Sequence, residues 1–586
     1  MRAVPMRAVD SIATYFGRRS APLFGVLSVP ADREVRAGVL ICPSVGKEHA
    51  ETTRGLKLFA EQLAAQGFAV LRFDYANTGE SAGDQSVPEA VDNWLASIEE
   101  AADWLRSIGV PQLIAVGHRV GALLLSHTPV ADAVDALVIW DPVEKGRRFL
   151  RVKTALLTVV TVTIDGSQPP PSDLVYTAGQ TLHPAAAAAF AKLSLPAGVG
   201  SALRPENVLT ALRDSDQTSR FAKAMADRGV QLIEIADQTR FLEPSHPSFL
   251  HFPTDEFDRI ASWIDQRAEA WPTAQVEFVP HTHAVVGQAR DGRPIVTRVH
   301  DLDTPDGPIM VWDTAIEGTH ESAMQVVISH SLGQYPRTGP SRLWYEVVSQ
   351  VAERGGRGLR YDRPTVGESG RARLSDGALM IYDDTYRRGS VAVPQSIELP
   401  PNAAIVHTGI CAGAWAAAHG ALAGKRLNPT AETTALLVNA QMWRLDPMKE
   451  YRAEDFGFRE TDSSGIGEQD TLARQTRRKL TSAGFRSARY IHMFVPRPWW
   501  SQVAQVPMIQ LPDVFLRRLA DRSVDTRLVF GPVDLDMFRH YNDGPEVLRR
   551  ASRPIRMDTY DMGDHTCYHV AAREAIVRNA VTVLGL

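Results

Sequence analysis

Cysteine is scarce in this chain, because its 586 residues include only Cys42, Cys411 and Cys567. Three cysteines cannot build the disulfide framework that stabilises small secreted domains, and their spacing matches no zinc-binding pattern. We therefore expect a reducing compartment. Each thiol must then be explained either by packing or by chemistry.

Other features are missing as well. The net charge is −5, so the basic excess typical of nucleic-acid-binding proteins is absent and we expect no nucleic acid partner. Residues 1–16 carry basic side chains but no apolar core of a secretory signal. The apolar residues 150–165 are too few to cross a bilayer and include Lys153, so we expect core or lid there and no membrane span. These absences predict a cytoplasmic protein.

An internal repeat is present. The segment LRFDYANTGESAG begins at Leu71 and LRYDRPTVGESG begins at Leu359, an offset of 288 residues (359 − 71 = 288). Upstream, LICPSVGKEH corresponds to VISHSLGQYP. Downstream, GHRVG (117–121) corresponds to GICAG (409–413), shifted by four further residues (409 − 117 = 292). Because the matching segments occur in the same order in both halves, they predict a tandem duplication. The length of the chain also favours two domains.

Each copy alternates short apolar runs with longer helical patterns. In the first copy, residues 39–44 and 69–75 are β-rich, whereas residues 52–68 and 87–109 have the spacing of amphipathic helices. This alternation predicts an α/β fold with a mostly parallel sheet and helices on both faces. We place the domains at 1–272 and 273–586, with a lid inserted at about 441–526 in the second.

The segment 409–413 looks like a nucleophile elbow. An apolar strand leads into Gly-x-Cys-x-Gly, and a small-residue helix follows, so Cys411 takes the place that serine holds in the G-x-S-x-G pattern. Such turns lie at the carboxyl ends of parallel strands, where sites of these sheets gather. The first copy has Arg119 at the same place, and a guanidinium cannot act as a nucleophile.

These motifs resemble α/β-hydrolase domains, and more narrowly the hydrolase-like proteins found with exosortase and polysaccharide biosynthesis systems. CPSVGKEH, RFDYANTGESAG and GHRVGALLL resemble a branch with arginine at the elbow, and GICAGAW, VNAQMW and GDHT resemble members with a cysteine elbow. The resemblance spans most of the chain. It implies two tandem α/β-hydrolase domains, of which the first is catalytically degenerate.

In this fold the chain order of the catalytic groups is nucleophile, acid, histidine. After Cys411, Asp534 follows the β-rich strand 528–530 in what we expect to be a loop, with Asp536 as the alternative acid, and His565 precedes the last helix. We therefore predict a Cys411–Asp534–His565 triad. The backbone N–H of Ala412 supplies one oxyanion donor, and Ser331 or Leu332 supplies the second. Cys567 is expected to be structural.

A cysteine at the elbow favours acyl transfer. A thiol that attacks a thioester forms another thioester, so the acyl-enzyme keeps its transfer potential for a later acceptor. Other cysteine-elbow members of the fold, by resemblance, are of two kinds: polyester synthases transfer acyl groups, whereas dienelactone hydrolases hydrolyse their substrates. We expect an acyltransferase with no bound cofactor or metal, and with coenzyme A or an acidic carrier protein presenting the acyl thioester. A thioesterase or hydrolase with the same triad and a non-catalytic tandem scaffold remain open.

Two features bear on anion binding. Residues 471–512 contain arginines, including Arg477 and Arg478, and no acidic residue before Asp513. Such a surface either docks an anionic donor or is an ordinary solvated face. Arg119 either binds a substrate anion or pairs with a local carboxylate. The sequence leaves both choices open.

Overall fold

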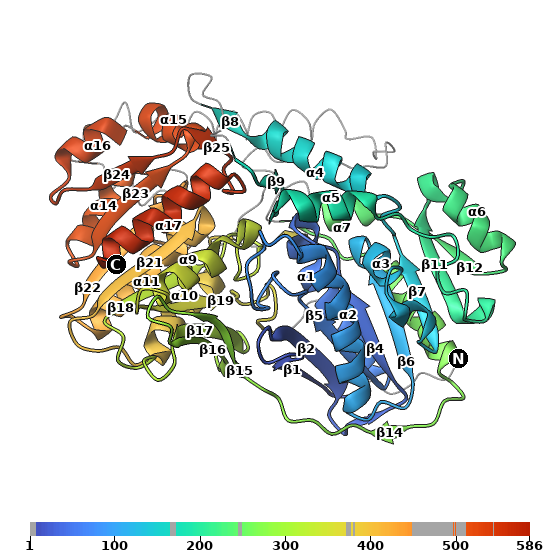
Figure 1. Cartoon of the computed structure of the whole chain (residues 1–586). Coiled ribbons are helices and arrows are strands. Elements are labelled where there is room, and N and C mark those ends of the chain that lie inside the picture. Colours follow the sequence, from blue (N-terminus) through green and yellow to red (C-terminus); the bar gives the residue numbers. More distant parts are fainter. Residues whose placement is uncertain are drawn as a thin grey trace, which may run out of the picture.

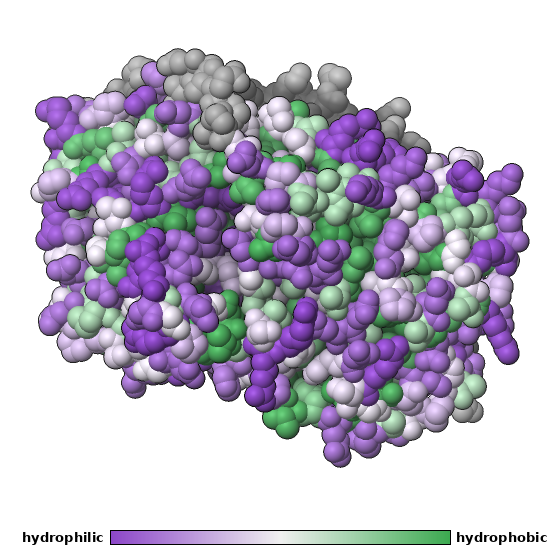
Figure 2. Space-filling view, in the orientation of Figure 1, coloured by the Kyte–Doolittle hydropathy of each residue, from purple (hydrophilic) through white to green (hydrophobic). Residues whose placement is uncertain are grey.

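The computed structural model describes residues 7–163, 172–243, 249–370, 377–378, 381–447, 496, 499, 511–542 and 544–586. Two large sheets lie side by side, one built from the first copy of the repeat and one from the second (Figure 1). On the face shown in Figure 2, hydrophilic residues cover both halves with hydrophobic ones interspersed among them. No helix within these residues combines the length and the apolar character that a membrane crossing requires.

The first sheet has eight strands in the order β1-β2-β5-β4-β6-β7-β11-β12. The second strand is antiparallel to both of its neighbours, and the pairs from β5 onward are parallel. The strands of this half are β1 Val9–Phe16, β2 Leu23–Pro30, β3 Glu34–Val35, β4 Ala37–Cys42, β5 Phe68–Phe73, β6 Leu113–His118, β7 Ala136–Trp140, β8 Val162–Thr163, β9 Val175–Thr177, β10 Gln180–Leu182, β11 Val208–Arg213, β12 Gln231–Ile235 and β13 Phe249–Leu250. The helices are α1 Lys47–Ala65, α2 Ala90–Ser107, α3 Val120–Leu125, α4 Gly146–Val160, α5 Pro184–Lys192, α6 Arg220–Asp227, α7 Gln238–Leu242 and α8 Thr254–Arg267.

The second sheet repeats this order after one added edge strand, as β15-β16-β17-β19-β18-β21-β22-β23-β24. Its strands, with the short pairs outside the sheet, are β14 Ala274–Gln275, β15 His283–Gln288, β16 Pro294–Leu302, β17 Ile309–Ile316, β18 Gln325–His330, β19 Arg357–Tyr361, β20 Gly377–Ala378, β21 Ala404–Ile410, β22 Glu432–Val438, β23 Asp525–Phe530, β24 Arg556–Thr559 and β25 Met562–Gly563. The helices are α9 Leu343–Ala352, α10 Asp384–Ser396, α11 Ala412–Leu427, α14 Pro512–Ala520, α15 Pro532–Tyr541, α16 Gly544–Arg550 and α17 Val570–Leu584.

Both faces of each sheet are covered. On β4, Leu40 packs into the core with α2 and α3, whereas the next residue, Ile41, packs into the core with α1 and α8. On β22, Leu436 and Leu437 divide in the same way between two cores. A strand buried on both faces needs a continuous apolar sequence, which is why these strands do not alternate. The predicted α/β fold, with two tandem, mostly parallel sheets that carry helices on both faces, is confirmed.

Parts of the predicted lid belong to the sheet domain instead. Within the expected range 441–526, helix α14 buries Phe515, Leu516 and Leu519 in the core beside β23. Because these apolar side chains are spaced for one helix face, the segment packs on the sheet rather than covering the site. Residues 448–495 lie outside the described residues.

The segment between the halves stays with the first half for a few residues past 272. Strand β14 pairs with β3, and Val276 and Phe278 pack against the core of the first sheet. The second sheet begins at β15. Figure 1 shows this connection running beneath the first half before it reaches the second.

The repeated motif R-x-D…G-E-S lies at the interface between the halves. In each copy the aspartate accepts a hydrogen bond from the backbone N–H of the glutamate: Glu80 donates to Asp74 over 2.8 Å, and Glu368 donates to Asp362 over 2.9 Å. The glycine before each glutamate has a φ near +50°, and a Cβ on it would collide with the aspartate. This tight turn aims each glutamate at the other half.

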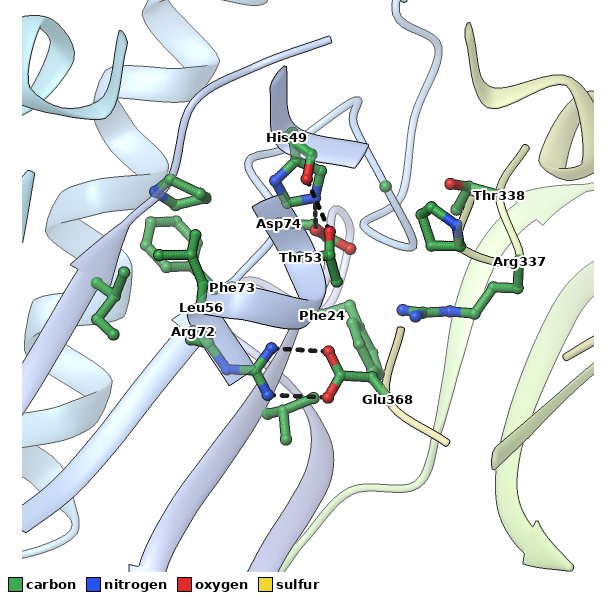
Figure 3. A pocket seen from close by; sticks show the side chains of 15 residues that line it. Phe24, His49, Thr53, Leu56, Arg72, Phe73, Asp74, Arg337, Thr338 and Glu368 are labelled. Carbon is green, nitrogen blue, oxygen red and sulfur yellow. Dashed lines mark hydrogen bonds and ion pairs between the residues drawn. The ribbon is translucent and has the colours of Figure 1, made fainter. Parts of the chain in front are cut away.

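The two halves exchange these contacts reciprocally. Arg72 makes two hydrogen bonds of 2.7 and 2.8 Å to Glu368 (Figure 3), and its counterpart Arg360 bonds Glu80 at 2.8 Å. Likewise Arg54 donates to the carbonyls of Gly367 and Ser369, and Arg342, which follows Arg54 by 288 residues (342 − 54 = 288), donates to those of Gly79 and Ser81. The tandem chain is therefore a fused pseudo-dimer with two-fold contacts.

Candidate active site

The elbow at Cys411 has the backbone of a strained strand-to-helix turn. Cys411 follows β21, precedes α11 and has φ 52° and ψ −109°, a left-handed φ that non-glycine residues seldom adopt. The flanking glycines are required by contact: a Cβ on Gly409 would lie 2.3 Å from Gly413, and one on Gly413 would lie 2.5 Å from the carbonyl oxygen of His330. Cys411 is 8% exposed.

The structure brings Asp534 and His565 together with Cys411. Asp534 accepts from Nδ1 of His565 at 2.8 and 3.0 Å, and Cys411 lies near enough to His565 to raise the pKa of the imidazole. The alternative acid, Asp536, is largely exposed and pairs with His540. Asp534 does not lie in a loop, as the sequence suggested, but in the first turn of α15, where it is 3% exposed. Pro532 at the helix start explains the difference, since proline suits that position.

The charge on His565 is stabilised by its neighbours. Burial alone would lower the pKa of His565, but Asp534 and Cys411 outweigh it and hold the pKa well above its ordinary value. The imidazolium form of His565 is therefore stabilised beside Asp534 and Cys411. A histidine held in this way can give or take a proton at the elbow, as a general acid or base does.

Sequence reasoning missed two residues that hold the triad. Asn439 (φ 45°) donates to the carbonyl of His565 at 2.9 Å and accepts from the N–H of Gly531 at 2.9 Å, so it ties the histidine turn to the start of the acid helix. Gln441 donates to Asp534 at 3.1 Å. Both belong to VNAQMW, a motif that carried the resemblance but received no chemical role.

The expected oxyanion residues lie together at the start of α11. Ala412 is the first residue of that helix, and Ser331 and Leu332 follow β18, whose carbonyl end touches Gly413. The carbonyl of Ser331 accepts a hydrogen bond from the hydroxyl of Tyr386. The buried Ser331 Oγ has no partner among the described residues.

The remaining cysteines are poor nucleophiles. Burial raises the pKa of Cys42 and of Cys567 well above the ordinary value, whereas Cys411 has a hydroxyl neighbour, Tyr382, at 3.5 Å from its sulfur. Among the described residues no three His, Cys, Asp or Glu side chains gather closely enough to hold a metal ion. Cys411 is thus the thiol on which chemistry can be expected.

The elbow of the first half keeps its shape but is filled by an ion-pair network. Arg119 has φ 55° and ψ −118°, and these backbone angles are nearly the same as those of Cys411. Its guanidinium donates twice to Glu48 at 3.1 Å and once to the carbonyl of Asp141. Lys153 on α4 also pairs with Glu48, at 3.0 Å. Of the two roles left open for Arg119, the structure shows the local carboxylate pair.

The other candidate anion ligands, Arg477 and Arg478, lie outside the described residues, as does most of the basic run. Trp499, one of its aromatics, is 61% exposed. The serines of the repeated motif serve the turns: Ser81 Oγ accepts from the N–H of Phe24, and Ser369 Oγ accepts from that of Met310, each at 2.9 Å.

Comparisons with known proteins found similarity only among solved structures. No family model matches the chain, and no curated protein matches its sequence. Among solved structures, Est1E from Butyrivibrio proteoclasticus, bound to ferulic acid, is 17% identical, with a TM-score of 0.32 over 44% of this chain and all of its own. A thioesterase domain from the curacin biosynthetic pathway is 15% identical, with a TM-score of 0.28 over 49% of this chain and 99% of its own. Brefeldin A esterase, described as a bacterial homologue of human hormone-sensitive lipase, is 18% identical, with a TM-score of 0.28 over 46% of this chain and 80% of its own.

Proposed function

We propose that the second half is a cysteine-dependent acyltransferase that takes an acyl group from a thioester onto Cys411. The observation that supports this most is the arrangement of the three predicted residues, in which His565 bonds Asp534 and lies near Cys411. A drifted, non-catalytic scaffold would have no reason to retain Asp534 beside His565. The added hydrogen bonds from Asn439 and Gln441 hold the same two residues.

The proposed cycle has two steps. The Cys411 thiolate attacks the thioester carbonyl, the carbon–sulfur bond to the donor breaks, and protonated His565 gives its proton to the departing thiolate. An acceptor hydroxyl, amine or thiol then attacks the acyl-cysteine while His565 takes its proton, and the Cys411 thiolate is released. Asp534 holds the imidazole in one tautomer and stabilises its charge throughout. The N–H of Ala412 and one from the 331–332 loop stabilise each oxyanion.

Cysteine at the elbow supports transfer over hydrolysis, because the acyl-cysteine conserves the energy of the donor thioester. Hydrolysis is the second candidate. His565 has 30% of its side chain exposed, so water can reach the base that would activate it. Coenzyme A or a carrier protein is the proposed donor on the chemistry of the thioester alone.

Intact-mass spectrometry tests the proposal. The full chain is incubated with a panel of acyl-coenzyme A thioesters of increasing length and then quenched in acid. We expect one acyl adduct on Cys411, absent in Cys411→Ala. Chasing the adduct with water, amines or alcohols separates transferase from thioesterase. If iodoacetamide labels Cys411 while no thioester of the panel acylates it, the proposed chemistry is wrong.

A further inference from the structure

The interface between the halves contains contacts that obey the two-fold repeat and others that break it. The arginine contacts described above come in pairs 288 residues apart. Glu51 on α1 makes a contact without a mate: the residues that correspond to Glu51 and Tyr335 are Gly339 and Lys47, and glycine has no side chain to bond. The duplication does not account for the contact of Glu51 with Tyr335, so this contact needs a separate physical reason.

Glu51 of the first half contacts the loop that leads from β18 in the second half. Its carboxylate accepts hydrogen bonds from the hydroxyl of Tyr335, at 2.8 Å, and from the side-chain amide of Gln334. Its side chain is 3% exposed, and its other partner is Lys47, one turn earlier, at 2.7 Å. Both loop residues follow within three positions of Leu332, so Glu51 fixes the loop that carries the expected oxyanion donors.

The same carboxylate is connected to the turn that carries His565. The Tyr335 hydroxyl bonds that of Tyr568, which comes three residues after His565. Burial, followed by the Glu51 carboxylate, raises the pKa of both tyrosines, so both hydroxyls keep their protons. A chain of neutral donors thus runs from Glu51 to both sides of the elbow.

Neighbouring contacts from the first half reach the same place. Leu157 on α4 is 6% exposed and packs in the core cluster that contains Cys411, Leu332 and Tyr568. Strand β8, just after α4, pairs with β25, which ends two residues before His565. Figure 1 shows α4 crossing from the first half toward β25. The first half therefore touches the second at both loops that surround the elbow.

We infer that Glu51 is a positioning residue for the active site of the second half, which makes the first half a structural part of that site. The inference rests on the proposed function for its chemistry. Glu51 does not touch the reacting atoms. It holds the 331–335 loop directly and the His565 turn through Tyr335 and Tyr568.

Two readouts on the full-length chain report the two loops. Acylation of Cys411 by a thioester needs the oxyanion donors and so reports on the 331–335 loop. Alkylation by iodoacetamide does not need these donors. It depends on how His565, flanked by Asp534, faces the sulfur, and so reports on the His565 turn. For Glu51→Ala we expect acylation to slow about 10- to 100-fold with little change in apparent KM, since a misplacement of about 1 Å costs about 100-fold. We also expect slower alkylation on the acid side of its pH profile.

The chain offers matched variants. Glu51→Gln keeps one acceptor and leaves Lys47, 16% exposed, free to turn to water, so an intermediate effect is expected. Tyr335→Phe removes the same link, and its effect should not add to that of Glu51→Ala. Glu368→Gln weakens the same interface, but the Glu368 carboxylate is bonded by Arg72 rather than by either loop. This variant should therefore lower the unfolding temperature without changing either readout.

The outcomes are distinct. Suppose that wild type is acylated and that Glu51→Ala has a lowered unfolding temperature. If this variant keeps both the wild-type acylation rate and the wild-type alkylation profile, Glu51 is only an interface residue and the inference is overturned. If wild type is not acylated by any thioester, the proposed function fails. The alkylation profile then still decides the role of Glu51, and a profile equal to wild type refutes it.

Discussion

The ion pair between Arg72 and Glu368 offers a quantitative test of how the halves are held together. Both side chains are buried, with 8% and 4% of their surface exposed, and two hydrogen bonds join them. Burial opposes the charge on Glu368, but Arg72 more than compensates and lowers the pKa of the carboxyl from 4.5 to about 2. Replacing Glu368 by glutamine removes the charge and leaves the guanidinium without its partner.

The size of the effect follows in two ways. The difference between 4.5 and about 2 corresponds to about 3 kcal/mol of unfolding free energy, at about 1.4 kcal/mol per pKa unit. Breaking a buried pair from one side costs about 3–5 kcal/mol in other proteins. We therefore expect Glu368→Gln to lose about 3 kcal/mol at pH 7. Because the folded pKa is depressed, this contribution is complete above about pH 4.5 and disappears as the pH falls through about 2.

The assay is urea unfolding followed by far-UV circular dichroism and tryptophan fluorescence, with coincident transitions as the test of two-state behaviour. A second variant isolates the cause. Replacing both partners, Arg72→Met with Glu368→Leu, should lower the unfolding free energy much less than the single change, because no buried charge is left unpaired. In addition, the buried Nε of Arg72 has no hydrogen-bond partner among the described residues, so its removal breaks no bond. A loss below about 0.5 kcal/mol for Glu368→Gln, or a double variant as unstable as the single one, would refute the reasoning.

Further predictions concern the two elbows. Asp534→Asn should slow thioester acylation about 100- to 10,000-fold, measured by quenched-flow mass spectrometry, whereas the exposed Asp536→Asn should react like wild type. Gly413→Ala should lower the unfolding free energy by about 1–3 kcal/mol in urea titration and slow acylation, because the new Cβ meets the backbone of the oxyanion loop; an unchanged acylation rate would contradict that contact. Arg119→Ala should lower the unfolding free energy, measured by the same titration, by more than the roughly 1 kcal/mol typical of near-surface changes, because it removes the bidentate partner of the buried Glu48. A loss under about 1 kcal/mol would show that Lys153 alone is enough to pair with Glu48.

The sequence predicted the parts of the fold that local pattern and repetition determine. Periodicity distinguished strands from helices, and the offset of 288 residues identified the duplication. Glycines at 409 and 413 indicated the elbow because only a missing Cβ permits that close approach. The order of residues along the chain then led to Asp534 and His565. Each of these signals is contained in one short segment or in the spacing of a few segments.

Contacts between distant segments were not predictable in the same way. On α1, charged residues recur every three or four positions, at Glu48, Glu51, Arg54, Lys57 and Glu61. Such a stripe is typical of a solvated helix face, but here four of the five are buried against the second half or the filled elbow. Charge spacing alone cannot reveal a partner that approaches from another domain. The roles of Asn439 and Gln441 were hidden for the same reason, since their partners lie about 90 to 126 residues further on.

The filled elbow and the asymmetric contact of Glu51 fit one physical picture of the first half. In a fused pseudo-dimer, contacts such as Arg72–Glu368 and Arg360–Glu80 occur twice and stabilise the pairing whichever half is catalytic. A half with Arg119 at its elbow therefore keeps the same interface contacts. Arg119 then anchors Glu48 and, through Lys153, helix α4, whose Leu157 packs beside the cluster containing Cys411. At the first elbow, where the second half has Cys411, these charged groups instead hold a helix that borders the candidate site of the second half.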